Sequence, residues 1–203
     1  IGSSPAVFEG IVYFITGSTL YALDAKNGEE MWKYNTERGG VGVGSPALYD
    51  GKLFFIARFG KLSALDAHSG GKKWEFQTEM GGGKSSSPAV RNETVYFGSD
   101  TTVFAVDAIT GEKKWEYKTS GRVISCPAVT QDTLYVGSGN MVYSLDALTG
   151  KKEWQFQTGG NIVSSPAVSN GIVYVGSQDG KLYALGKNPI SSPIQPVSEA
   201  VVQ

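Results

Sequence analysis

Three short landmarks recur in one order along this chain, roughly every 40 residues. The first is the pentapeptide SSPAV or a variant of it, with its proline at Pro5, Pro46, Pro88, Pro127 and Pro166. The second is LDA or VDA, with its aspartate at Asp24, Asp66, Asp107 and Asp146. The third is a tryptophan followed two residues later by another aromatic residue, at Trp32, Trp74, Trp115 and Trp154. Such a period indicates stacked copies of one supersecondary unit.

Each copy predicts four β-strands. The fourth copy reads SCPAV, TLYVGS, MVYSLDA and KKEWQFQT, and these short segments are rich in β-branched and aromatic residues. No segment has the apolar stripe of a helix. Four short strands per copy are typical of a blade of a β-propeller. We therefore predict an all-β propeller of five four-stranded antiparallel repeats in a single domain over 1–187, with the repeats at about 3–43, 44–85, 86–124, 125–163 and 164–187.

The landmarks themselves have structural explanations. Proline is tolerated at the start of an innermost strand, because one edge of that strand pairs with nothing. The aspartate is expected to hold the turn before the outer strand, with a glycine of positive φ four residues later. The tryptophan supplies apolar area between blades. A functional site is therefore sought where the copies differ.

The whole unit resembles the repeat of the pyrroloquinoline-quinone-like propeller family, over residues 3 to about 186. That family includes quinoprotein dehydrogenases, and also propellers without quinone, such as a lipoprotein scaffold for outer-membrane protein assembly and sensor domains of bacterial kinases. The dehydrogenases use adjacent cysteines, a tryptophan under the quinone and Glu, Asn and Asp ligands for calcium. This chain has one cysteine, Cys126, and its tryptophans all belong to predicted outer strands. The resemblance therefore implies the non-enzymatic branch, with no cofactor.

The sequence contains no set of residues that predicts another kind of catalytic site. His68 is the only histidine, and it lies in a turn that the other copies form without histidine, so a Ser-His-Asp triad is not expected there. No His, Cys and carboxylate residues have the spacing of a transition-metal site. We predict that the chain is not an enzyme and has no catalytic, cofactor or metal site.

The charge balance limits the partners. The chain has eighteen Lys and Arg residues and nineteen Asp and Glu residues, and no block of like charge. This balance argues against nucleic acid as a partner. No apolar run approaches the roughly 20 residues of a transmembrane helix. The leading hypothesis is an extracytoplasmic (periplasmic, cell-surface or secreted) scaffold that binds protein. The alternatives are a glycan-binding, lectin-like propeller and a degenerate quinoprotein fragment.

The candidate interaction face lies at one end of the blades. In an antiparallel four-stranded blade, the connectors from outer strand to next inner strand emerge at the same end as the turns between second and third strands. There the second copy has ARFG where the fifth has SQDG, and the first two connectors are longer than the last two. Drift of tolerant loops is the alternative explanation. The predicted face comprises Glu37, Arg38, Arg58, Phe59, Glu79, Met80, Lys84 and Arg122.

The fifth copy is incomplete. Gly186 stands where the aspartate is expected, and no tryptophan pair follows. The missing outer strand is expected upstream of residue 1, from another subunit, or replaced by the tail. That tail, 188–203, is rich in Pro and Ser and is predicted to be a linker or extended arm. An open edge on this blade would be a point for self-association.

Overall fold

The computed structural model describes residues 3–36, 44–78 and 85–186, and it confirms the all-β propeller fold. Five antiparallel sheets follow one another, each with its strands in chain order. Over the described residues the first four sheets have four strands and the fifth has three. The predicted tail, 188–203, lies outside the described part. No helix in the described ranges is long and apolar enough to cross a membrane.

The strands have nearly the same lengths in every sheet. The first sheet contains β1 (Ala6–Phe8), β2 (Ile11–Thr16), β3 (Thr19–Asp24) and β4 (Glu30–Asn35). The second contains β5 (Ala47–Tyr49), β6 (Lys52–Ala57), β7 (Lys61–Asp66) and β8 (Lys72–Gln77), with the single-turn helix η1 (Arg58–Gly60) between β6 and β7. The third contains β9 (Ala89–Arg91), β10 (Thr94–Ser99), β11 (Thr102–Asp107) and β12 (Lys113–Lys118). The fourth contains β13 (Ala128–Val129), β14 (Thr133–Ser138), β15 (Met141–Asp146) and β16 (Lys152–Gln157). The fifth contains β17 (Ala167–Ser169), β18 (Ile172–Gly176) and β19 (Leu182–Leu185).

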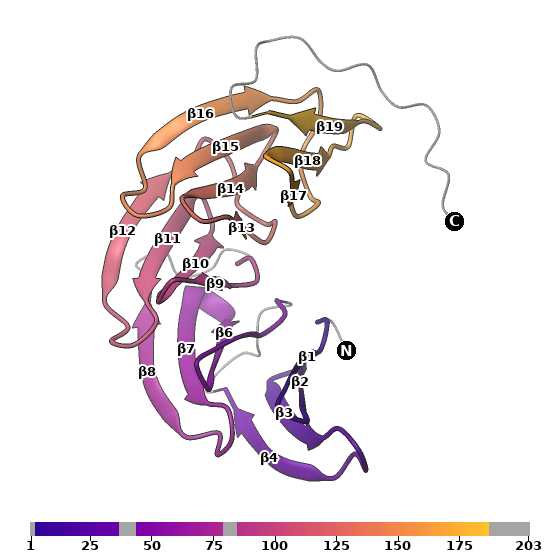
Figure 1. The fold of residues 1–203 in the computed structure, drawn as a ribbon, viewed down its shortest axis with the longest axis vertical. Helices are drawn as coiled ribbons and strands as arrows, with labels where there is room; N and C mark the ends of the chain where they lie inside the picture. The colour runs from indigo at the N-terminus through magenta and orange to yellow at the C-terminus, as the bar shows by residue number, and fades with distance from the viewer. Residues whose placement is uncertain (1–2, 37–43, 79–84, 187–203) are drawn as a thin grey trace.

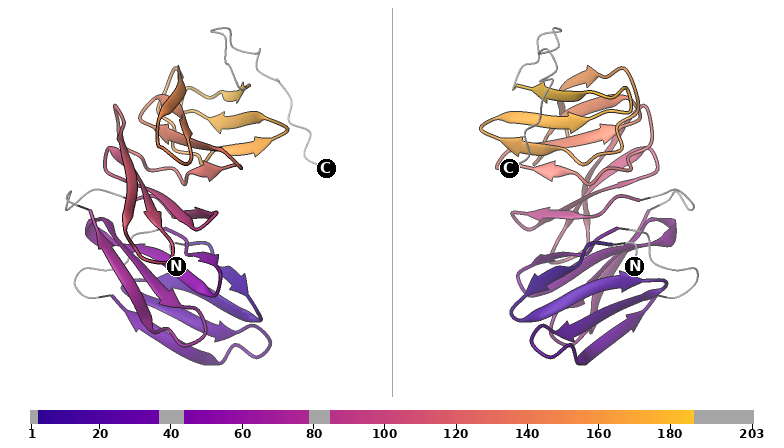
Figure 2. Two further views of the ribbon diagram at one scale, coloured as in Figure 1. Left: turned by 60° about the vertical axis from the view of Figure 1, so that its left-hand side comes forward. Right: turned by 90° about the vertical axis from the view of Figure 1, so that its right-hand side faces the viewer.

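The sheets are arranged as an arc, with the first and last blades at its two ends (Figure 1). The short first strands lie on the inner side of the arc, and the fourth strands form its outer rim. Two further views show the same succession of twisted sheets from the first blade to the last (Figure 2). The inner strand β9 contacts both β5 and β13. The pentapeptide is therefore the innermost segment of each blade, as predicted.

The first serine of the pentapeptide attaches the inner strand to its neighbour in the same blade. The Ser3 hydroxyl accepts a hydrogen bond from the Ile15 N–H (3.1 Å) and donates one to the Ile15 carbonyl (3.3 Å). Ser164 makes the same pair of bonds to Gly176, both at 2.9 Å. The side chain thus extends the sheet ladder past the point where proline has removed a backbone donor.

The second serine connects one blade to the next. The Ser4 N–H donates to the Ser45 hydroxyl (2.9 Å), and the Ser45 N–H donates to the Ser87 hydroxyl (2.8 Å). The Cys126 N–H donates to the Ser165 hydroxyl in the same way (3.1 Å). These bonds run along the inner side of the arc. The repeated pentapeptide is therefore a device for joining blades.

The turns before the outer strands are held as predicted, and in the second, third and fourth blades the turn also covers the tryptophan of the preceding blade. Asp66 accepts hydrogen bonds from the Ser69 N–H and hydroxyl, both at 2.9 Å, and Gly70 has φ +70°. The Trp32 indole N–H donates to the Ala67 carbonyl (3.0 Å). A Cβ on Gly70 would lie 2.7 Å from Trp32 Cε3, so only glycine allows the turn to lie flat on the indole ring.

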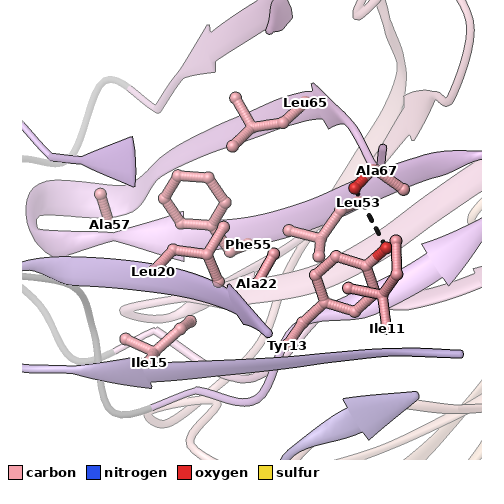
Figure 3. Close-up of a cluster of buried hydrophobic side chains, with 10 residues drawn as sticks. All are labelled: Ile11, Tyr13, Ile15, Leu20, Ala22, Leu53, Phe55, Ala57, Leu65 and Ala67. Carbon is pink, nitrogen blue, oxygen red and sulfur yellow. Dashed lines mark hydrogen bonds between the residues drawn. The ribbon is translucent and has the colours of Figure 1, made fainter. Parts of the chain in front are cut away.

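The hydrophobic core is divided into layers between successive sheets. Figure 3 shows the layer in which side chains of β2 and β3 meet those of β6 and β7, with the Tyr13 hydroxyl donating to the Ala67 carbonyl (3.0 Å). Strands β10 and β14 are buried at every position, whereas β2 alternates between buried and half-buried residues. A middle blade packs on both faces, and an end blade of the arc packs on one.

Candidate functional site

Each connector begins at the end of its blade that carries the turn between the second and third strands. The Thr119 N–H, at the start of a connector, donates to the Thr101 carbonyl in the turn between β10 and β11 (2.8 Å). The Thr158 N–H donates to the Asn140 carbonyl (2.9 Å), and the same contact occurs in the first two blades. We call this end the connector face: the turns β2–β3, β6–β7, β10–β11, β14–β15 and β18–β19 with the described parts of the connectors.

Phe59 is the most unusual residue of the connector face. Its backbone has φ +66° and ψ +24°, the left-handed region that bulky residues rarely occupy. The Gln77 side-chain amide donates to the Phe59 carbonyl (2.8 Å). A Cβ on the next residue, Gly60, would lie 2.1 Å from Thr78 Oγ1, so the turn is pressed against the connector. The Phe59 residue is nevertheless 50% exposed.

Arg122 lies on the third connector and belongs to the same end. Its Nε is 3.4 Å from Asp100 Oδ1, in the turn between β10 and β11. The backbone is fixed on both sides, because the Val123 N–H donates to the Asp100 carbonyl (2.7 Å) and the Gly139 N–H donates to the Arg122 carbonyl (3.1 Å). The guanidinium side chain remains largely exposed on this rigid connector.

The structure therefore places two of the eight predicted residues, Phe59 and Arg122, on one end of the molecule. Five others lie outside the described residues: Glu37, Arg38, Glu79, Met80 and Lys84. The side chain of Arg58 also lies outside the described part. The contribution of these six to the face stays a prediction.

Two exposed apolar residues of the connectors were not predicted. Ile124 and Val163 each follow a buried β-branched residue, Val123 or Ile162, in corresponding places of successive connectors. Val123 packs over Gly98, where an added Cβ would lie 2.2 Å from Val123 Cγ1. The first residue is anchored by this contact and the second is left exposed. The adjacent β-branched pairs VI and IV in the sequence were a signal for this arrangement.

Two titratable side chains at this end are hydrogen-bonded to each other. The Tyr183 hydroxyl donates to Asp179 Oδ2 (2.5 Å), which lowers the pKa of Asp179 and raises the pKa of Tyr183. Burial raises the pKa of the Cys126 thiol to about 11. Over the described ranges, no three His, Cys, Asp or Glu side chains gather closely enough to hold a metal ion.

A cavity of about 580 Å³ lies between the fourth and fifth blades. It is lined by β14, β16, the β13–β14 turn and the inner part of the fifth blade, including Tyr135, Trp154, Val168 and Gly171. At three earlier junctions the corresponding tryptophan is covered by the turn of the next blade. At Trp154 that turn would have to come from the incomplete fifth blade.

The stacked sheets, the turns docked on tryptophan and the inner serines define a β-propeller of PQQ-like repeats. A family model described as "Outer membrane protein assembly factor BamB" matches the chain over residues 1–125 and 118–188. The chain belongs to this PQQ-like repeat family. No curated protein matches its sequence.

Solved structures with the same fold have different functions. BamB from Moraxella catarrhalis has a TM-score of 0.82 and 20% identity, over 95% of this chain and 62% of that one. The quinohemoprotein alcohol dehydrogenase ADHIIG from Pseudomonas putida HK5 has a TM-score of 0.80 and 19% identity, over 96% and 42%. The computationally designed protein Ika8 has a TM-score of 0.78 and 15% identity, over 89% and 56%. The chain thus spans less than two thirds of each, and the likeness shows the fold alone.

Proposed function

We propose that this chain is a non-catalytic, extracytoplasmic scaffold that binds another protein through its connector face. Membership of the family described by an outer-membrane protein assembly factor supports the class and the compartment. The observation that carries the proposal is Phe59, an aromatic residue held half-exposed in a left-handed backbone conformation.

Phe59 has the properties of an anchor for a partner. A left-handed conformation at a non-glycine residue costs on the order of 1–3 kcal/mol. Because the Phe59 residue is half-exposed, burial of its side chain offsets only a small part of that cost. The Gln77 bond and the close packing of Gly60 on Thr78 hold the turn, so little conformational freedom would be lost on binding. Aromatic residues and arginine are enriched at the centres of interfaces.

The remaining described residues of the connector face fit the same role. Ile124 and Val163 add exposed apolar area on fixed connectors, and Arg122 adds a guanidinium with free donors beyond its Asp100 contact. The Cys126 thiol, with a pKa of about 11, is protonated at neutral pH and unsuited to nucleophilic catalysis. The face thus offers apolar and cationic contacts and no activated nucleophile among its described residues.

Site-specific photo-crosslinking tests the proposal. A photoreactive phenylalanine analogue is placed at Phe59 and, in a matched variant, at Leu148, which is 82% exposed at the opposite end of the blades. In cells of the source organism, we expect a discrete crosslinked protein from position 59 and none from position 148. Equal crosslinking from both positions, or only from 148, would contradict a connector-face interface.

The identified partner then allows a quantitative measurement. Phe59→Ser should weaken its binding at least roughly tenfold, as expected for an anchor residue, and Arg122→Glu should weaken it and reduce its salt dependence. Leu148→Ser serves as the control and should leave the affinity unchanged. An unchanged affinity for Phe59→Ser in a folded protein would remove this residue from the interface.

A further inference from the structure

A cavity of about 440 Å³ lies between the second and third blades, whose outer strands β8 and β12 follow one another on the rim of the arc (Figure 1). We call it the β8–β12 cavity. Both blades have all four strands, and they pack in turn against the first and the fourth blade. The wall from the second blade is the end of β8 and the residue after it, and the wall from the third blade is formed by β11 and β12. The described lining residues are Phe76, Gln77, Thr78, Thr102, Phe104, Lys113, Glu116 and Lys118.

The preceding junction is closed at the same place. There the corresponding cavity, between the first and second blades, has a volume of only about 10 Å³. Lys61 lies opposite Gln77 in the ladder, and its side chain reaches diagonally to Glu75, with Nζ 3.3 Å from Oε1. The third blade has Thr102 at the position of Lys61. The exchange of lysine for threonine removes the side chain that closes the junction, and the cavity opens there.

The charges in the β8–β12 cavity leave one cation uncompensated. Glu116 Oε2 lies 2.8 Å from Lys113 Nζ, so these two charges neutralise each other. Lys118 lies opposite Thr102 in the ladder, and it has no ion-pair or side-chain hydrogen-bond partner among the described residues. An ammonium group without a counter-ion, next to a hydroxyl donor, favours an anionic ligand. A cationic ligand would instead be repelled by Lys118.

The apolar part of the cavity consists of two phenylalanine rings. Phe76 and Phe104 have ring centroids 5.9 Å apart at 60°. Both rings also pack on Phe97, which is fully buried. Since these contacts hold the rings in place, a ligand that lies against them would order few additional side chains. Fixed aromatic walls of this kind suit a flat apolar group, which gains stacking or edge-to-face contacts in addition to burial.

We propose that the β8–β12 cavity binds a small amphiphilic acid, a carboxylate carried on an aromatic or similarly flat apolar body. The carboxylate pairs with Lys118 Nζ and accepts a hydrogen bond from the Thr102 hydroxyl. The apolar body lies against Phe76 and Phe104. The volume is within the range of small-molecule sites, roughly 300–1,000 Å³, whose linings combine apolar area with a few polar groups.

This site is separate from the proposed protein interface. The side chains that would contact the acid belong to β8, β11 and β12, whereas the connector face consists of turns and connectors. Binding of a small acid here does not require that Phe59 contact a protein. The inference therefore goes beyond the proposed function, and either can fail without the other.

Cinnamate, which joins a carboxylate to a flat aromatic body, is the probe, and cinnamamide is its neutral analogue of nearly the same shape. The full chain, isotope-labelled for NMR, is titrated with each, and the amide chemical shifts report both affinity and location. We expect saturable shifts in β11, β12 and the end of β8, with a dissociation constant on the order of 1 mM for a ligand of this size. Cinnamamide should bind roughly three- to tenfold more weakly, because it lacks the charge that Lys118 recognises.

Two substitutions taken from the chain's own repeat test the lining residues. Thr102→Met introduces the residue that the fourth blade has at this position, Met141, and should abolish binding because its longer side chain fills the cavity. Lys118→Gln introduces the residue of the fourth blade at that position, Gln157. It should weaken cinnamate binding roughly three- to tenfold and leave cinnamamide binding unchanged. Because both residues occur at the same place in another blade, both variants should fold.

A lysine elsewhere on the rim is the control. Lys152→Gln makes the same change on the outer strand of the fourth blade, outside the cavity, and should leave cinnamate binding unchanged. The proposal is overturned if cinnamate shifts no amides around the cavity, or if cinnamamide binds as tightly as cinnamate. It is also overturned if folded Thr102→Met binds cinnamate like the unmodified chain, or if the two lysine variants behave alike.

Discussion

The series of inner serines is interrupted at one residue, Cys126. Serines at this place accept a hydrogen bond from the preceding blade, as Ser45 and Ser87 do, at 2.9 and 2.8 Å. A thiol is a weak acceptor. We predict that Cys126→Ser raises the free energy of unfolding by about 1 kcal/mol by completing the series. Urea unfolding measures this, and Ser45→Ala should change stability by a similar amount in the opposite direction. A neutral Cys126→Ser would show that these bonds do not contribute to stability.

Gly150 and Gly28 separate the two reasons for glycine in the turns before the outer strands. Both have positive φ, +71° and +75°. A Cβ on Gly150 would lie 2.5 Å from Trp115 Cε3, whereas a Cβ on Gly28 meets nothing within 4 Å. We predict that Gly28→Ala costs about 1–2 kcal/mol from backbone strain alone, and Gly150→Ala about 1–3 kcal/mol more from the clash. Equal losses in urea unfolding would contradict the docking of the turn on tryptophan.

Sequence reasoning worked for residues whose partners lie in the same copy and was incomplete for those between copies. The Asp66 turn is local, so its aspartate and its glycine could be assigned from the pattern. Phe59 was selected by comparing copies, but its positive φ could not be foreseen, because it depends on the packing of Gly60 against Thr78, 18 residues later. The absence of a fifth outer strand was predicted, whereas the uncovered Trp154 was not, since its usual partner lies in the following copy.

At the scale of strands, the contacts between blades carry the stability. Phe97 of β10 stacks on Phe104 of β11, with ring centroids 5.3 Å apart, and Phe76 of the preceding blade packs edge-on against both rings. Phe14 and Tyr21 form the same stacked pair in the first blade, at 5.4 Å, but no described blade covers them. One position of the repeat thus exists in a covered and an uncovered form.

This difference predicts unequal losses for one substitution. Phe97→Ala should lower the free energy of unfolding by about 3–5 kcal/mol, as for a fully buried phenylalanine. Phe14→Ala should lower it by about 1–2 kcal/mol, because its ring is only half-buried. Urea unfolding followed by tryptophan fluorescence compares the two. A loss at Phe14 as large as that at Phe97 would mean that another surface covers the first blade in solution.

At the scale of the whole molecule, the fifth blade is expected to accept a fourth strand that is placed directly after Gly186. Replacing residues 187–197 with the sequence of residues 147–157, ALTGKKEWQFQ, places a copy of the turn and outer strand of the fourth blade directly after Gly186 in the chain. The turn would cover Trp154 and the strand would pair with β19, with a small loop-closure cost because the segments are adjacent. We predict that the free energy of unfolding of this variant is about 2 kcal/mol higher than that of the unmodified chain, which is the upper range for single stabilising changes. The control is the same replacement with alanine in place of the turn glycine, and its free energy of unfolding should rise little. If both replacements have the stability of the unmodified chain, β19 and Trp154 do not form a strand-accepting edge.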